Sequence, residues 1–270
     1  MRTPAEDPAR RRRTGSVVMV TLAMVAGLAA CGSGGAGDPA APPAASEDAG
    51  GAGPTSEGCA PTGDGPPGDA EPREVADVDG DDENDSAWLT GGDQRRLGIT
   101  TASGATFSVP LGSASPERAA AVVDRVATED GTAPVALVDT GRAVRLFSVA
   151  GCGLTPTRNQ EGVPYTFDKG FTGQGTGVEC ADEVPTVDGD RDADRLHLAA
   201  LNAEASDDGS VFTVTRTFVD LSAGATRATD GVEETVVEGA PADDAVVAAA
   251  QRTSCGDRVA GEDGPVEPAP

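Results

Sequence analysis

The sequence of 270 residues is poor in aromatic and basic side chains and has a single histidine and no long hydrophobic run. Aromatic residues make up 3% of the chain, and 45 acidic residues against 20 basic ones give a formal net charge of −25. A single histidine excludes every multi-histidine metal site. A chain this acidic repels phosphate, so we expect no nucleic-acid partner. No stretch reaches the roughly 20 apolar residues that a membrane-spanning helix requires.

The first thirty residues have the pattern of a secretory signal peptide. A basic block at residues 10–13 precedes an apolar run at residues 17–30, which is the order of segments found in such signals. The run ends in LAAC, whose last residue is Cys31, and this ending resembles the bacterial lipobox. The resemblance implies cleavage before Cys31 and a lipid anchor on its thiol, which would hold the protein at the outer face of the cell membrane. An ordinary signal peptide with a chance cysteine, or an uncleaved anchor, is the alternative interpretation.

The composition of the remaining chain changes twice. Residues 32–71 contain no Val, Ile, Leu, Met, Phe, Tyr, Trp, Lys or Arg, and such a segment cannot bury enough apolar surface to fold. We therefore expect a disordered linker of Gly, Ala, Pro and acidic residues at 31–72. All eight aromatic residues lie between Trp88 and Phe218, which places the folded domain at 73–258 and predicts a disordered tail at 259–270.

Valine-rich segments separated by glycine-containing turns predict a mainly β domain. The expected strands are 87–90, 96–101, 106–110, 135–138, 144–149, 196–201, 211–219 and 234–237. Residues 241–252 begin with proline, carry acids in their first turn and end in arginine, which predicts a short C-terminal helix. The segment AAAVVDRV at 119–126 fits either a helix or a strand.

Three segments of six residues align without gaps: 75–80 (VADVDG), 126–131 (VATEDG) and 184–189 (VPTVDG). A short apolar stretch follows each one, and their Asp-Gly pairs stand 51 and 58 residues apart. This spacing is typical of blade-like β repeats. The sequence therefore predicts three blade-like repeats that form a small or incomplete propeller-like β domain. Chance recurrence of Asp-Gly turns in a biased sequence is the alternative.

The first aligned segment runs into an acidic loop, DVDGDDEND. Alternating residues of this loop can turn side-chain or peptide oxygens toward one centre, and Ca²⁺ prefers six to eight oxygen ligands. The candidate ligands are the carboxylates of Asp77, Asp79, Asp81 and Asp85 and the peptide oxygen of Glu83. An EF-hand does not fit, because Asp82 and Trp88 stand where that motif needs Gly and Glu.

The loop resembles the calcium loop of FG-GAP/VCBS repeats, which form the blades of integrin alpha-subunit propellers and occur in many bacterial surface proteins. That family's loop reads D-x-D/N-G-D-G-x-x-D and leads into a β-strand. The first segment matches it at Asp77, Asp79, Gly80, Asp81 and Asp85, while Asp82 replaces the second glycine. The third segment matches at Asp188, Gly189, Asp190 and Asp194, and the second keeps only Asp130 and Gly131. The resemblance implies calcium as the cofactor, held by the first loop and more weakly by the third; a solvated acidic turn without metal is the alternative.

Four cysteines remain besides Cys31: Cys59, Cys152, Cys180 and Cys255. An even number in an exported chain predicts two disulfides. Three pairings are possible, and we expect Cys152–Cys180 and Cys59–Cys255, because the first closes a glycine-rich excursion and the second joins the two ends of the domain. A zinc site fits less well, because no two cysteines stand close together in the sequence.

The remaining features do not indicate catalysis. His197 lies in the alternating segment RLHL without a nucleophile motif, which favours a surface or edge residue. The glycines between 170 and 177 lack the strand-to-helix context of a phosphate-binding loop and predict an ordinary loop. The leading hypothesis is a non-enzymatic, calcium-stabilised β domain that is tethered to the membrane and binds an unknown envelope or extracellular ligand. The alternatives are an extracytoplasmic hydrolase that uses carboxylates, and a metal-free structural or solute-binding lipoprotein.

Overall fold

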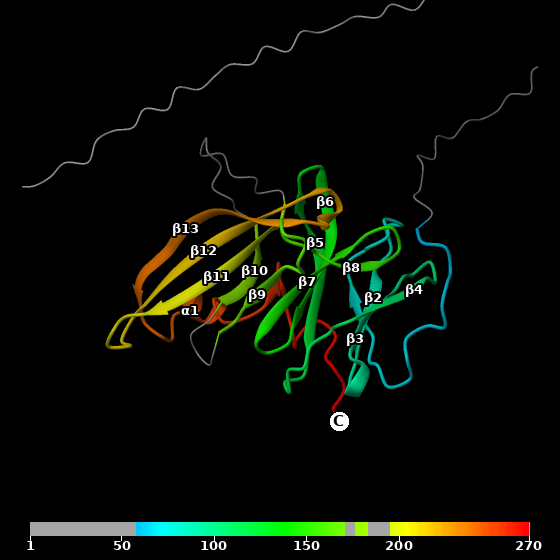
Figure 1. The fold of residues 1–270 in the computed structure, drawn as a ribbon, viewed down its shortest axis with the longest axis horizontal. Helices are drawn as coiled ribbons and strands as arrows, with labels where there is room; N and C mark the ends of the chain where they lie inside the picture. The colour runs from blue at the N-terminus through cyan, green and yellow to red at the C-terminus, as the bar shows by residue number, and fades with distance from the viewer. Residues whose placement is uncertain (1–57, 171–175, 183–194, 270) are drawn as a thin grey trace, which may run out of the picture. The chain divides into compact units, whose positions relative to one another are not determined.

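The computed structural model of the protein describes residues 58–170, 176–182 and 195–269, which all belong to one unit of the chain, Ala52–Pro270. The expected signal peptide, Cys31 and most of the expected linker lie outside these residues, as do Asp188, Asp190 and Asp194 of the third aligned segment. The described part consists of antiparallel sheets with one short α-helix (Figure 1), which confirms the prediction of a mainly β domain. No helix in it is long and apolar enough to cross a membrane.

Three large antiparallel sheets of four, five and four strands follow one another along the chain, and four strands of each are paired in chain order. The first contains β1 (Arg73–Val75), β2 (Asp85–Thr90), β3 (Arg96–Thr100) and β4 (Thr106–Pro110), with a 3₁₀ turn, η1 (Gly92–Gln94), before β3. The second contains β5 (Ala120–Thr128), β6 (Gly131–Asp139), β7 (Ala143–Val149) and β8 (Leu154–Pro156), and β9 (Thr166–Asp168) also pairs with β7. The third contains β10 (Thr176–Ala181), β11 (His197–Ala205), β12 (Phe212–Leu221) and β13 (Ala228–Ala240), with η2 (Ala223–Ala225) before β13.

The second sheet packs between the other two. On one face, Leu137 belongs to the same buried cluster as Leu198 of the third sheet. On its other face, Phe147 belongs to the cluster that contains Leu89 of the first sheet, so the green strands of Figure 1 lie between the cyan and the yellow-to-orange ones. Because both faces are covered, β6 is an almost continuous apolar run rather than an alternating one. The described strands close into neither a barrel nor a ring of blades.

The segment AAAVVDRV, which fits a helix or a strand by sequence, forms most of β5. Its side chains alternate between the two buried clusters: Val122 faces the third sheet, and Val123 faces the first. A helix would place neighbouring side chains about 100° apart and could not supply two opposite apolar faces in this way. The need to fill the space between two sheets therefore selects the strand.

Helix α1 (Ala245–Ala249) covers the outer face of the third sheet. It begins at Asp244, whose carboxylate accepts a 2.9 Å hydrogen bond from the Val246 N–H. Val247 is buried in one cluster with Phe212. The helix is shorter than the predicted 241–252, because turns occupy the flanking residues. Gly177, expected in a loop, lies in β10, where a Cβ would be only 2.6 Å from the Ala250 carbonyl carbon.

The end of the chain does not form a disordered tail. Ala121 donates its N–H to the Pro265 carbonyl at 3.0 Å, and Glu267 donates its N–H to the Ala119 carbonyl at 2.8 Å. Residues 263–267 therefore lie beside the start of β5. The prediction of disorder is wrong for residues 259–269, because backbone hydrogen bonds, a buried carboxylate and the packing of small side chains such as Ala260 against the core hold them. A short pair of strands, β14 (Ser254–Cys255) and β15 (Arg258–Val259), precedes this segment.

The end of the expected linker also packs on the domain. Thr62 forms a parallel bridge with Ala105, and the Thr106 N–H donates to the Thr62 carbonyl at 2.7 Å. The folded part of the chain therefore begins at residue 58 at the latest, not at 73. Composition places the boundary too late, since this segment is held by the backbone and by one cysteine.

The two disulfides join Cys59 to Cys152 and Cys180 to Cys255, with Cα–Cα distances of 5.7 and 4.3 Å. The number of disulfides agrees with the prediction, but the expected pairs Cys152–Cys180 and Cys59–Cys255 are wrong. Cys152 lies in the turn between β7 and β8, which meets the beginning of the folded chain, while β10 and β14 contact each other. The disulfide pairing is determined by which segments contact each other in the folded domain. The lengths of the loops along the sequence do not reveal these contacts.

Candidate metal centre

The acidic loop joins β1 to β2, and the Asp77 carboxylate organises it. The Asp77 carboxylate accepts hydrogen bonds from the N–H groups of Asp79 at 3.1 Å, Gly80 at 2.6 Å and Asp82 at 3.1 Å. Gly80 and Asp82 both have left-handed backbone conformations, with φ of 82° and 67°. These are the two positions at which the FG-GAP/VCBS pattern has glycine, so the loop keeps a backbone suited to that pattern although Asp82 replaces the second glycine.

Asp85 is the first residue of β2 and is 2% exposed. One of its carboxylate oxygens accepts the Val78 N–H at 2.7 Å and the other accepts the Ala102 N–H at 2.8 Å. Burial away from water raises the pKa of Asp85 above the ordinary 3.8, the two backbone hydrogen bonds oppose that rise, and the negative charges of Asp79 and Asp81 add to it. The Asp85 carboxylate therefore anchors the loop to the turn after β3. Its burial, however, makes the charged form less favourable than it is in water.

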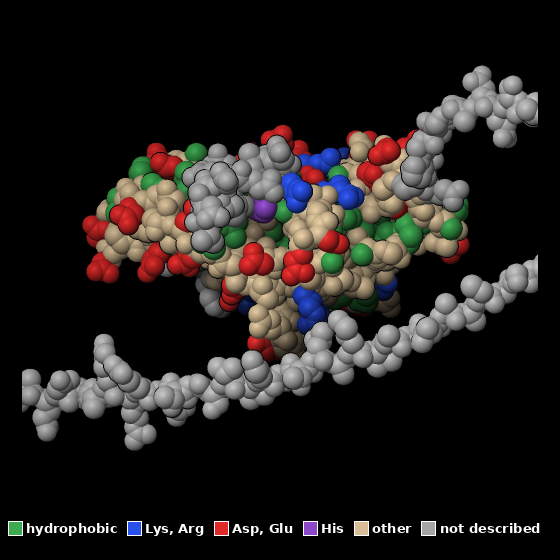
Figure 2. All heavy atoms as spheres, turned by 90° about the horizontal axis from the view of Figure 1, so that it is seen from above, with side chains coloured by type: hydrophobic (Ala, Val, Ile, Leu, Met, Phe, Trp, Pro, Cys, Tyr) green, Lys and Arg blue, Asp and Glu red, His purple; other side chains and the backbone are tan. Residues whose placement is uncertain are grey.

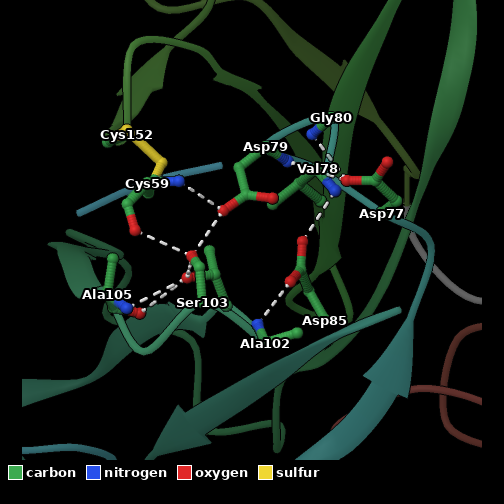
Figure 3. Close-up of a disulfide and its surroundings, with 11 residues drawn as sticks. Cys59, Asp77, Val78, Asp79, Gly80, Asp85, Ala102, Ser103, Ala105 and Cys152 are labelled. Carbon is green, nitrogen blue, oxygen red and sulfur yellow. Dashed lines mark hydrogen bonds between the residues drawn. A yellow bond between two sulfur atoms is a disulfide. The ribbon is translucent and has the colours of Figure 1, made fainter. Parts of the chain in front are cut away.

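Asp79 lies between the loop and the beginning of the folded chain. Its Oδ2 accepts the Cys59 N–H at 2.7 Å and lies 2.9 Å from the Ser103 hydroxyl oxygen. Its Oδ1 is buried and has no hydrogen-bond partner, and Figure 3 shows this oxygen pointing toward Asp77 and Asp85. A buried carboxylate oxygen without a partner is unfavourable by a few kcal/mol, and a bound cation would remove that penalty.

The structure brings three of the predicted ligands together. Asp77, Asp79 and Asp85 can each offer a carboxylate oxygen, and these oxygens lie within 4.8 Å of one another. Oxygens that share one calcium ion lie within about twice the ~2.3–2.6 Å calcium–oxygen distance of each other, so the three carboxylates fit a calcium ion. The side chain of Asp81 is not part of this group, and that of Glu83, whose peptide oxygen was the expected ligand, is exposed.

Residues from three distant segments support the loop, and no local sequence pattern predicts them. Ser103, in the turn between β3 and β4, has its hydroxyl oxygen 2.7 Å from the Cys59 carbonyl oxygen and 2.8 Å from the Thr101 hydroxyl. Arg125 of β5 donates to the peptide oxygen of Asp77 at 3.3 Å. The second sheet and the beginning of the folded chain thus both hold the loop of the first sheet in place.

The other candidate residues do not form a comparable cluster in the described part of the chain. Asp130, from the second aligned segment, lies in the turn between β5 and β6 and accepts a 2.9 Å hydrogen bond from the Thr128 hydroxyl. The third segment falls between β10 and β11 in the sequence but lies outside the described residues. His197 begins β11 and is partly buried. The first two segments thus both include the connection between the first and second strands of their sheets.

Replacing Asp82 by glycine is expected to raise the free energy of unfolding of the calcium-free protein by up to about 1 kcal/mol. Glycine adopts the left-handed conformation of this position without strain, and the substitution also removes one charge from an acidic loop. Asp82→Ala removes the same charge but keeps the strain, so it should be less stable than Asp82→Gly by about 1 kcal/mol. Urea unfolding of the two variants measures this difference, and equal stabilities would contradict the backbone argument.

The site therefore offers a hard cation three convergent carboxylates, one of them with a buried oxygen that has no partner among the described residues. Oxygen donors of this kind favour calcium over softer metals. A scan against models of protein families, a search of curated proteins and a search of solved structures found no match to this chain.

Proposed function

We propose that this protein is a membrane-anchored extracytoplasmic lipoprotein whose β domain binds a calcium ion through Asp77, Asp79 and Asp85 and acts as a binding module of the cell envelope. The observation that carries the calcium site is the buried Asp79 Oδ1, which has no hydrogen-bond partner and points toward two further carboxylates. Three carboxylates this close repel one another when no cation is present, and a divalent ion turns that repulsion into attraction.

The membrane anchor rests on the lipobox-like ending at Cys31 and on the use of the other cysteines. The remaining four cysteines form two disulfides, which leaves Cys31 as the cysteine for a lipid. Disulfides persist in oxidising compartments, which agrees with export. Acidic side chains are spread over the face shown in Figure 2, and basic ones gather at a few places. We therefore expect a ligand that is neutral or positively charged rather than nucleic acid.

The three sheets are proposed to be three blade-like repeats of an open, propeller-like domain. Each contains four antiparallel strands paired in chain order, to which β9 adds a fifth in the second sheet, and neighbouring sheets share buried clusters face to face. The first two aligned segments lie at the same position of their sheets, which supports a common repeat over chance recurrence. Helix α1 covers the outer face of the third sheet, where a further blade would otherwise pack.

The calcium site is tested by melting the protein in 10 mM calcium and in excess chelator. Extracellular calcium modules have dissociation constants of about 10⁻⁴–10⁻³ M, which at this concentration gives about 1.4–2.7 kcal/mol of added stability. For a folded part of this size we expect Tm to rise by about 3–10 °C. Isothermal calorimetry should show one saturable site.

Matched variants separate this site from the general acidity of the chain. Asp79→Ala removes both carboxylate oxygens, including the one that has no partner among the described residues, and should abolish the calcium-dependent rise in Tm. Glu83→Gln removes one charge from the same loop but keeps its peptide oxygen and alters only an exposed side chain, so the rise should remain. Absence of saturable binding at millimolar calcium would end the proposal and favour a metal-free structural or solute-binding lipoprotein.

The hydrolase alternative receives no such support from the described residues. A carboxylic acid catalyst needs a raised pKa and access to a substrate. Asp85 is the one described carboxyl group with a raised pKa, yet it is 2% exposed and both of its oxygens accept peptide N–H groups. We therefore retain the binding module as the proposed function.

A further inference from the structure

We propose that the Cys59–Cys152 disulfide controls the calcium site, so that reduction of this bond weakens calcium binding and bound calcium protects the bond from reduction. This inference rests on the proposed calcium site and adds a redox input to it. The ligand loop and the disulfide meet in the region drawn in Figure 3.

Cys59 touches the site through its backbone. Its N–H donates to Asp79 Oδ2 at 2.7 Å, which fixes the carboxylate so that Oδ1 faces the other ligands. The Cys59 carbonyl oxygen lies 2.7 Å from the Ser103 hydroxyl oxygen, which is also 2.9 Å from Asp79 Oδ2. Cys59 itself is 3% exposed. The orientation of Asp79 therefore depends on the position of the Cys59 backbone.

The residue before Cys59 lies equally close to the acidic loop. Gly58 has a φ of 62°, and a Cβ at this position would lie 2.9 Å from Asp79 Oδ2 and 3.0 Å from Asp81 Oδ2. Residues 58 and 59 thus form a backbone cover over two carboxylates of the loop. This cover presents the Cys59 N–H to the Asp79 carboxylate, and glycine at position 58 places no side chain against the loop.

The disulfide is the covalent link that holds this cover to the rest of the domain. It joins Cys59 of the first described segment to Cys152, in the turn between β7 and β8 of the second sheet. The sequence separation is 93 residues, so the bond greatly restricts where Cys59 can lie. Residues 60–72 contain no large apolar side chain, and segments with few buried apolar contacts open at low free energy. Without the bond, Cys59 can therefore leave Asp79.

The chemistry is a thiol–disulfide exchange with an extracellular dithiol. Two thiol groups of the reductant become its disulfide, and their two electrons and two protons convert the Cys59–Cys152 bond into two cysteine thiols. Loss of a hydrogen bond that orients a ligand typically lowers metal affinity by about 10–100-fold. Because coupling between two equilibria is reciprocal, calcium should oppose reduction by the same factor, which corresponds to a shift of about 30–60 mV for a two-electron couple.

The second disulfide provides a matched control within the same chain. Cys180–Cys255 joins β10 to β14 and lies in a different buried cluster from Val78 of the acidic loop. The double variant Cys180→Ser/Cys255→Ser should keep the wild-type calcium affinity within about twofold, whereas Cys59→Ser/Cys152→Ser should raise the dissociation constant by about 10–100-fold. Calorimetry on the full chain measures both, and circular dichroism shows whether each variant is folded.

A second measurement needs no variant. The full chain is equilibrated with a dithiol buffer with or without calcium, free thiols are alkylated, and each disulfide is followed by peptide mapping. Calcium should shift the reduction of Cys59–Cys152 and leave that of Cys180–Cys255 unchanged. Equal calcium affinity with and without the Cys59–Cys152 bond, or reduction of this bond that calcium does not change, overturns the inference alone. An oxidised wild-type chain that binds no calcium overturns the proposed function as well.

Discussion

Replacing Glu267 by alanine is expected to lower the free energy of unfolding by about 3–5 kcal/mol. Glu267 is 5% exposed and forms a two-point ion pair with Arg95, in which Nε and a terminal nitrogen donate to the two carboxylate oxygens at 2.7 and 2.5 Å. The Ala119 N–H also donates to Oε2 at 2.8 Å. Removing the carboxylate leaves a largely buried guanidinium and a buried N–H without this partner, which is why the loss exceeds that of a surface pair.

The effect of this substitution extends beyond the ion pair, because Glu267 joins three segments. Arg95 also donates to the carbonyl oxygens of Ser115 and Glu117, both at 2.8 Å, and Arg118 donates to the Glu267 carbonyl at 2.8 Å. The end of the chain, the connection between β2 and β3, and the segment before β5 therefore meet at one carboxylate. Its loss should release the C-terminal segment from the first two sheets.

Urea unfolding of the full chain measures the prediction, with Glu262→Ala as the matched control. Glu262 lies on the same C-terminal segment and is exposed, so its replacement should change stability by about 0.5 kcal/mol or less. Proteolysis should cut the C-terminal segment of Glu267→Ala faster than that of the control. Equal stability of the two variants would show that the buried pair does not hold the segment.

The sequence predicts well those parts of the protein in which neighbouring residues decide the structure. Valine-rich alternation places most strands correctly, and the spacing of Asp77, Asp79 and Asp85 identifies the residues that the loop brings together. The first two aligned segments lie at the connection between the first two strands of their sheets, although the sequence predicted blade-like repeats and not this position. Each of these features depends on contacts within a few residues of the chain or within one hairpin.

The failures share a different cause, since each depends on contacts between distant segments. Glu267 finds Arg95 across 172 residues, and Cys59 reaches Cys152 across 93. Composition favours disorder for both ends of the folded chain, because their order depends on backbone hydrogen bonds, one carboxylate and one disulfide, and few large apolar side chains mark these segments. The contact of Cys59 with Asp79 is likewise absent from any local pattern. These distant contacts determine both the disulfide pairing and the surroundings of the metal centre.

Asp85→Ala is expected to lower the free energy of unfolding of the calcium-free protein by about 2–3 kcal/mol, because it leaves the buried N–H of Val78 and the partly buried N–H of Ala102 without their acceptors. The loss should be larger in calcium, since the variant also lacks a ligand. Asp81→Ala is the matched control: it removes a carboxylate from the same loop that accepts only the nearby Glu83 N–H at 2.9 Å, and it should lose less than about 1 kcal/mol.

The pH dependence of stability, compared between the wild type and Asp85→Ala, separates the effect of the Asp85 charge from that of its hydrogen bonds. Burial raises the pKa of Asp85 in the folded state above its ordinary 3.8, so the folded protein binds this proton more tightly than the unfolded chain does. Between the raised pKa and 3.8, falling pH therefore stabilises the calcium-free wild type relative to Asp85→Ala. Calcium requires the carboxylate, so the calcium-dependent rise in Tm should shrink over that interval. Melting curves across this pH range, with calcium and with chelator, measure both effects. If the difference in Tm between the wild type and Asp85→Ala does not change with pH, Asp85 is not held as a desolvated anion.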